Sequence, residues 1–150
     1  MRSAATRLLL SCALAALAAC SSDPGVAPGE RLVRLPGGQK IVAEVAATQE
    51  SMARGMMYRD SLAADRGMLF LHSRPSRNPY WMHNCKIALD IIWMDASRRV
   101  VEISANTPPC EKEAKDCPNY GGNEVSMFVL ELAAGMAAKY GITTGTVIDF

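Results

Sequence analysis

The sequence predicts a mainly β domain of the α+β class, folded as a compact β-sandwich or a distorted barrel with two short helices. Short apolar runs recur along the chain, and turn-forming residues separate them. Only two segments have the composition of a helix, and both are short. About 120 residues follow the N-terminal region, which is enough to build one hydrophobic core.

The first half of the domain is expected to form a hairpin, a helix and a buried strand. Gly37-Gly38 is typical of a tight turn between strands. Thr48 is a suitable helix N-cap, and Gly55 is a typical helix stop. The expected elements are strands at 31–35 and 39–47, a helix at 48–54 and a short buried strand at 67–71.

The second half is expected to contain more strands and one further helix. Prolines and charges predict a loop at 72–79, the segment 95–98 reads as a turn, and Gly141 is a helix stop. The expected elements are strands at 80–84, 89–94, 99–105 and 125–130, a helix at 131–140 and a last strand at 146–150.

The N-terminus has the layout of a secretory signal. Arg2 and Arg7 precede an apolar stretch, LLLSCALAAL, that is too short to span a membrane. The sequence Leu17-Ala18-Ala19-Cys20 resembles a bacterial lipobox, which implies cleavage before Cys20 and acylation of that residue. Several acyl chains on one residue would be enough for stable anchoring.

We therefore expect three regions in the chain. Residues 1–19 form a lipoprotein signal peptide, residues 20–30 hold the lipidated cysteine and a flexible linker, and residues 31–150 form one β-rich domain. The expected location is the bacterial cell envelope, with the protein attached to the lipid bilayer and facing the periplasm or the exterior.

The charge of the chain argues against a nucleic-acid partner. The chain has 16 Lys and Arg and 15 Asp and Glu. Loss of Arg2 and Arg7 with the signal leaves 14 basic residues against 15 acidic ones, a net charge of −1. No basic cluster is present that could form a binding face for nucleic acid.

Three cysteines remain in the expected domain, and an exported protein is expected to form disulfides. Cys110 and Cys117 lie in one polar, proline-rich loop, so their pairing is favoured over the two pairings that include Cys85. Cys85 would then be an unpaired thiol.

Several segments together resemble one known family. They are ARGMMYRDSL (53–62), GMLFLH (67–72), YWMHNCKIALDIIWMD (80–95) and VLELAAGMAAKYGITTGTVIDF (129–150). The chain is similar over most of 33–150 to the prokaryotic family named domain of unknown function 192. This resemblance implies a compact β-rich domain of jelly-roll type and implies no activity. The family commonly has Thr where Cys85 stands and Lys where His83 stands.

Polar residues within the segment 80–95 are candidates for a site. In a regular strand, His83 and Cys85 would share one face. With Met82 and other nearby methionines they could bind a soft metal ion such as Cu(I), or they could form a reactive thiol–imidazole pair. The simpler interpretation is a buried thiol beside a hydrogen-bonded histidine.

Asp90 lies between apolar residues and needs a partner if it is buried. Arg54 or Arg59 is expected to provide it, as a structural ion pair. In the alternative, Arg54, Arg59, Asn84 and Asp90 line a small-ligand pocket that has Trp81 as its apolar wall. A hydrolase would need a second carboxylate near Asp90, and Glu131 is the candidate.

These observations favour a membrane-anchored, extracytoplasmic lipoprotein with a non-catalytic domain that binds a small ligand or acts as a scaffold. No cofactor is expected, and copper is the alternative. The rival functions are a soft-metal binder that uses Met82, His83 and Cys85, and an enzyme that uses Cys85 with His83 or uses Asp90.

Overall fold

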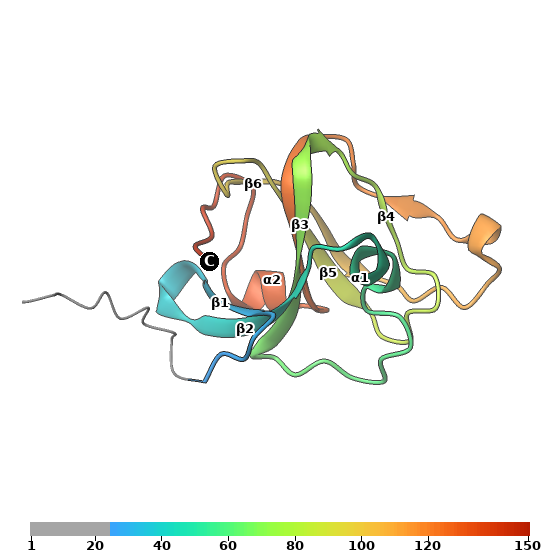
Figure 1. Ribbon diagram of the computed structural model, residues 1–150, viewed down its shortest axis with the longest axis horizontal. Coiled ribbons are helices and arrows are strands. Elements are labelled where there is room, and N and C mark those ends of the chain that lie inside the picture. The colour runs from blue at the N-terminus through green and yellow to red at the C-terminus, as the bar shows by residue number, and fades with distance from the viewer. Residues whose placement is uncertain (1–24) are drawn as a thin grey trace, which may run out of the picture.

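The computed structural model describes residues 25–150, and its main feature is a mixed six-stranded sheet with the strand order β1-β2-β3-β8-β5-β6 (Figure 1). β2 and β3 pair in parallel, and the other neighbours in this sheet are antiparallel. A separate two-stranded sheet pairs β4 with β7. The predicted signal peptide and Cys20 lie outside the described residues.

The strands are β1 Glu30–Arg34, β2 Lys40–Ala46, β3 Arg66–Arg77, β4 Tyr80–Trp81, β5 Leu89–Met94, β6 Val100–Thr107, β7 Asn119–Tyr120 and β8 Val125–Ala133. The helices are α1 Gln49–Arg54 and α2 Met136–Lys139, with short 3₁₀ turns η1 Pro36–Gly38 and η2 Ala114–Asp116.

The structure confirms the predicted class, because the domain is mainly β with two short helices. The large sheet is not closed into a barrel, since β1 and β6 are its two edges. Near the C-terminus, single bridges join Arg34 to Asp149 and Arg99 to Val147 where a continuous strand was predicted.

The predicted helix at 131–140 is wrong in its first half. Glu131, Leu132 and Ala133 continue β8, and only Met136–Lys139 is helical. The segment consists of good helix formers, but β8 lies between β3 and β5, and pairing on both sides outweighs the local helical preference. β3 likewise extends through the predicted loop as far as Arg77.

The large sheet is buried on both faces, and each face has its own core cluster. In β5, the side chains of Ile92 and Met94 belong to the first cluster. Those of Leu89, Ile91 and Trp93 belong to the second cluster. All six residues of β5 are buried, which explains why its sequence is almost uniformly apolar instead of alternating.

The second cluster lies under α1, which is placed by its caps. The Thr48 hydroxyl accepts a hydrogen bond from the backbone N–H of Ser51, and the Ser51 hydroxyl accepts one from the backbone N–H of Thr48. Gly55 ends the helix with a positive φ of 46°. The chain then turns back over the sheet, so that Met56 is buried in the second cluster.

Candidate functional site

A small pocket lies between α1, β4 and the second core cluster, and we name it the Glu131 pocket. Its volume is about 30 Å³. α1 and the turn after it form one side, while β4 and the residues that follow it form another. The lining residues are Met52, Ala53, Arg54, Gly55, Met56, Met57, Phe70, Tyr80, Trp81, His83, Cys85 and Glu131.

Glu131 is the most unusual residue of this pocket. The residue is 4% exposed, and no atom of the described chain makes a hydrogen bond with its Oε2. A buried polar atom without a partner is costly, so few occur in native structures. Burial raises the pKa of the Glu131 carboxyl to about 8, although the charge of Arg59 lowers it in part. The carboxyl is therefore mostly protonated at neutral pH.

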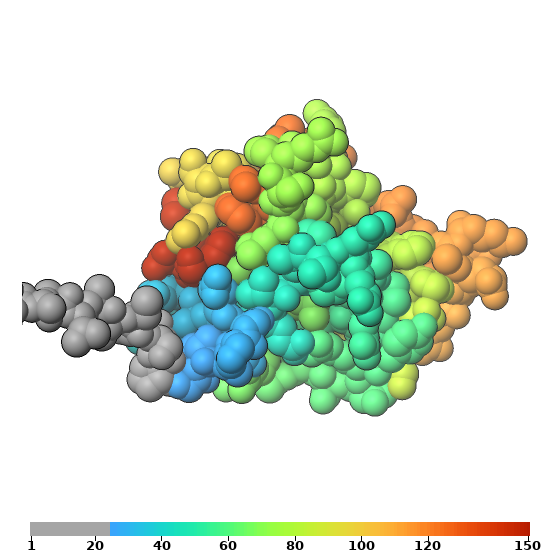
Figure 2. Space-filling view, in the orientation of Figure 1, coloured from blue at the N-terminus to red at the C-terminus, as the bar shows by residue number. Residues whose placement is uncertain are grey.

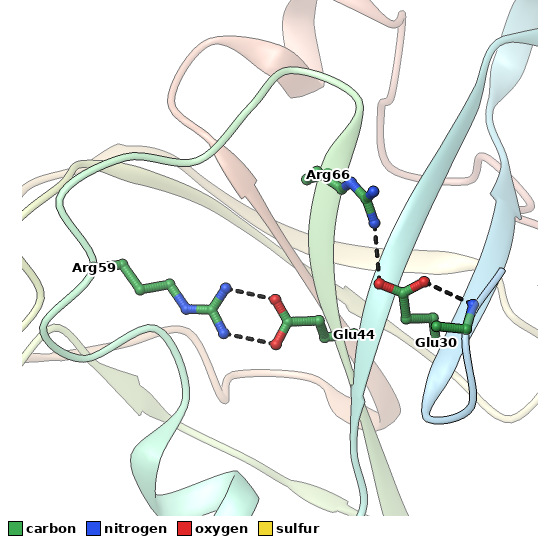
Figure 3. Close-up of polar contacts among 5 residues, drawn as sticks. Glu30, Glu44, Arg59 and Arg66 are labelled. Carbon is green, nitrogen blue, oxygen red and sulfur yellow. Dashed lines mark hydrogen bonds and ion pairs between the residues drawn. The ribbon is translucent and has the colours of Figure 1, made fainter. Parts of the chain in front are cut away.

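Arg59 does not pair with Glu131, because Glu44 already binds its guanidinium (Figure 3). Arg59 Nη1 and Nη2 donate to Glu44 Oε1 and Oε2 at 2.6 and 2.7 Å, a bidentate arrangement. These hydrogen bonds hold the pKa of Glu44 below its ordinary value. The pair lines a larger hollow of about 440 Å³, whose wall shares Arg54, Gly55 and Met57 with the Glu131 pocket.

Aromatic rings form much of the wall of the Glu131 pocket. Phe70 and Tyr80 meet edge to face with 5.0 Å between ring centroids. The Tyr80 hydroxyl is 3.1 Å from His72 Nε2, so its polar end has a partner. The Trp81 ring is half-exposed, and its centroid lies 5.1 Å from that of His83.

The expected partnership of Asp90 with Arg54 or Arg59 is wrong. Asp90 is fully buried, and its two carboxylate oxygens accept hydrogen bonds from the backbone N–H groups of Asn106 at 2.8 Å and Ala137 at 2.7 Å. The second bond satisfies a donor in the first turn of α2, which has no side-chain cap of its own. Strand alternation explains the error, since Asp90 points to the sheet face opposite to that of Ile91.

The same alternation separates Asp90 from Glu131. Ile91 is opposite Glu131 across the β5–β8 pair, while Asp90 is opposite Leu132 of the first cluster. The two carboxyl groups therefore lie on opposite faces of the sheet and cannot act on one substrate.

Asn84 has a framework role in the structure. It adopts a positive φ of 57°, which Asn tolerates and which ends the extended backbone after β4. The side-chain amide of Asn84 donates to the Tyr58 hydroxyl at 2.8 Å. The backbone carbonyl of Asn84 accepts from the backbone N–H of Tyr58, also at 2.8 Å. Asn84 therefore ties the turn after α1 to the segment after β4. Of the five predicted pocket residues, only Arg54 and Trp81 line the Glu131 pocket.

His83 and Cys85 both line this pocket, although no regular strand brings them there. Met82 is fully buried in the second cluster and does not line the pocket. Burial and the Glu131 carboxyl raise the pKa of the Cys85 thiol to about 12, so it is protonated at neutral pH. Within residues 25–150, no group of three or more His, Cys, Asp and Glu side chains could hold a metal ion.

Cys110 and Cys117 are joined by a disulfide with an S–S distance of 2.05 Å. The segment around η2, between these two cysteines, projects from the body of the molecule at the right of Figure 2. The backbone of Cys110 donates to Met82 O and accepts from Asn84 N, at 3.1 and 2.9 Å. The disulfide loop therefore supports the same segment that carries His83 and Cys85.

Sequence reasoning gave Glu131 only a secondary role, as a second carboxylate for Asp90. The signal that could have identified it is a single acid within the apolar run VLEL. Interpreted as a strand, that run places Glu131 on the same face as Val129, which is buried in the second cluster. The assignment of Glu131 and Leu132 to a helix concealed this alternation.

Glu131 predicts a specific dependence of stability on pH. Its pKa is raised above the ordinary value of 4.5 to about 8 in the folded state. Between these values the folded protein holds a proton that the unfolded chain has lost. A rising pH should therefore lower the free energy of unfolding, by about 1.4 kcal/mol per pH unit from this residue. Urea unfolding of the wild type and Glu131→Gln at several pH values measures the difference in slope.

The exposed Glu124 provides a matched control for this measurement. Glu124→Gln should keep the slope of the wild type, whereas Glu131→Gln should flatten it. Equal slopes in all three proteins would show that Glu131 titrates normally.

Cys85 should resist alkylation in the folded protein. At pH 8 a thiol with a pKa near 12 has about a thousandfold less thiolate than an exposed cysteine, and only 5% of this residue is exposed. Mass spectrometry after iodoacetamide treatment, without reductant, should show label at Cys85 only in denaturant. Rapid labelling of the folded protein, absent from Cys85→Ser, would contradict this burial.

Comparison with known proteins gives a family and no activity. The sequence profile of DUF192, described as "Uncharacterized ACR", matches residues 32–150. No curated protein matches the chain. Within the described residues, no helix has the length and apolar character needed to cross a membrane.

Two crystal structures are similar to this chain. The first is of a protein of unknown function from Novosphingobium aromaticivorans, with 32% identity, a TM-score of 0.71, and 87% of this chain and 94% of that chain covered. The second, from Sinorhizobium meliloti, is described as a "putative transcription regulator", with 28% identity, a TM-score of 0.68 and coverage of 80% and 92%. The expected resemblance is confirmed: the chain belongs to the family of domain of unknown function 192.

Proposed function

We propose that this chain is a lipoprotein of the bacterial cell envelope whose folded domain binds a small ligand without chemical conversion. Acylated Cys20 would attach the protein to the bilayer, and the linker to residue 30 would separate the domain from the membrane surface. The support for anchoring is the lipobox-like sequence LAAC after an apolar signal. The support for binding is the Glu131 carboxyl, a buried acceptor without a partner in a lined pocket.

The chemistry of the pocket disfavours the rival enzymes. A thiol nucleophile needs a lowered pKa, and that of Cys85 is raised. A glycosidase needs two carboxyl groups on one substrate, and Asp90 lies on the other face of the sheet from Glu131. Asp90 also has both oxygens engaged by backbone amides, so it is not available as a base.

A soft-metal site is the second candidate, because the same pocket gathers several soft donors. Its wall includes the thioethers of Met52, Met56 and Met57 together with His83 and Cys85. These groups suit Cu(I). The group without a partner is a carboxyl, however, which is a hard oxygen donor that Cu(I) does not favour. Small-ligand binding therefore ranks first.

Acylation can be tested on the full chain in a bacterial host supplied with an alkyne-tagged fatty acid. The wild type should incorporate the label. Cys20→Ser should lose it, because only that residue would be acylated. Cys12→Ser is the matched control and should keep the label, since Cys12 would leave with the signal. Equal labelling of Cys20→Ser and wild type would exclude anchoring through Cys20.

Ligand binding can be tested on the full-length protein in detergent with ¹³C-methyl methionine labels. Small fragments of each charge class should include at least one that shifts the methyl signals of Met52, Met56 and Met57. Met94 is fully buried in the first cluster and provides the internal control. If no cationic, neutral, anionic or metal probe shifts the three pocket methyls, the pocket is not a binding site.

A further inference from the structure

We infer that the Glu131 pocket takes a primary ammonium group, with Glu131 as the residue that binds it. This inference rests on the proposed ligand-binding function and specifies the ligand class. The ammonium would donate a hydrogen bond to Glu131 Oε2, the buried carboxyl oxygen that no group in residues 25–150 satisfies. A charged donor binds a carboxylate more strongly than a neutral donor does.

The size of the pocket limits the ligand. A volume of about 30 Å³ has room for roughly two water-sized groups. An NH₃⁺ group with one attached methylene fits this space. A quaternary ammonium is too large and has no N–H to donate, and a guanidinium is also too large. The rest of the ligand must therefore extend outward from the pocket.

The walls of the pocket also suit a cation on an alkyl stem. Phe70, Tyr80 and Trp81 offer aromatic rings, whose faces attract cations. The methionine side chains on the opposite side offer apolar contacts for a methylene group. α1 and the turn after it form one side of the pocket, and Glu131 is buried, so bulk water competes poorly for its carboxyl.

Within residues 25–150, no charged group takes the place of the ligand. The cation that acts on Glu131 is Arg59, and its guanidinium is bound to Glu44 by two hydrogen bonds. Cys85 and Tyr80, which also line the pocket, have raised pKa values and stay uncharged at neutral pH. Arg54, which is exposed, and His83 also line the pocket.

Binding is coupled to a proton. At neutral pH the Glu131 carboxyl carries its proton, and its oxygen bonds an incoming ammonium best as a carboxylate. Binding converts a protonated carboxyl and R–NH₃⁺ into a carboxylate–ammonium pair. One proton is released to the buffer. The apparent affinity should therefore rise about tenfold per pH unit from pH 6 towards the Glu131 pKa of about 8.

The test titrates the full-length protein in detergent with propylammonium and follows the methionine methyl signals. Propanol, propionate, tetramethylammonium and guanidinium serve as comparison probes. Propylammonium should shift the signals of Met52, Met56 and Met57, with the stated pH dependence, and should leave Met94 unchanged. Glu131→Gln should abolish the response. Glu124→Gln, which replaces an exposed carboxylate away from the pocket, should keep both the response and its pH slope.

Titrations with two further probes distinguish the source of the ammonium. Ethanolamine represents a small free amine or headgroup, and N-acetyl-lysine amide represents the side chain of a protein partner. Binding of either, lost in Glu131→Gln, supports the inference and identifies the source.

Other outcomes overturn the inference in distinct ways. Equal shifts with propanol, or a response that persists in Glu131→Gln, would show that no ammonium site is present while ligand binding itself survives. A response to Ag⁺ as a Cu(I) substitute, without any response to amines, would favour the soft-metal function. If no probe produces a shift, both the inference and the proposed ligand binding fail.

Discussion

The antiparallel pairing of β5 with β8 at the centre of the sheet is the constraint on which the rest of the structure depends. Its register sets Ile91 opposite Glu131 and Asp90 opposite Leu132. Since side chains alternate between faces along a strand, this register sends the two buried carboxyl groups to opposite cores. A shift of one residue would exchange the faces of an entire strand.

The two carboxyl groups differ in what the surrounding chain provides. Asp90 receives two backbone N–H donors, from β6 and from the first turn of α2, so its burial joins three elements. Glu131 receives no donor at Oε2 from the described part of the chain, and Arg59, whose charge acts on it, is held by Glu44. The first is a framework group, because every interaction it needs is internal. The second is the candidate binding group, because its buried oxygen lacks the hydrogen-bond partner that buried polar groups normally have.

Local signals predicted much of the fold and little of the site. The Thr48 cap and Gly55 stop placed α1 correctly, and the hydrophobic pattern placed β1, β2, β5 and β6 to within a few residues. The segment from Glu131 to Tyr140 was misassigned in part, since its helix-forming residues carry no information about the two neighbouring strands. Arg54 and Trp81 line the Glu131 pocket, whereas Arg59 and Asp90 have other partners.

The sequence by itself determined the mainly β class, the short helices, the family and the residues able to carry chemistry. The class and the helices depend on composition, on periodicity and on the conformational preferences of neighbouring residues. The family follows from the resemblance of whole sequence segments. Only the tertiary structure decided that Glu44 binds Arg59, that backbone amides bind Asp90, and that Glu131 faces the pocket beside Cys85. Those pairings join residues from different elements of the fold, and strand register together with the path of the connecting segments, which no local pattern specifies, brings them together.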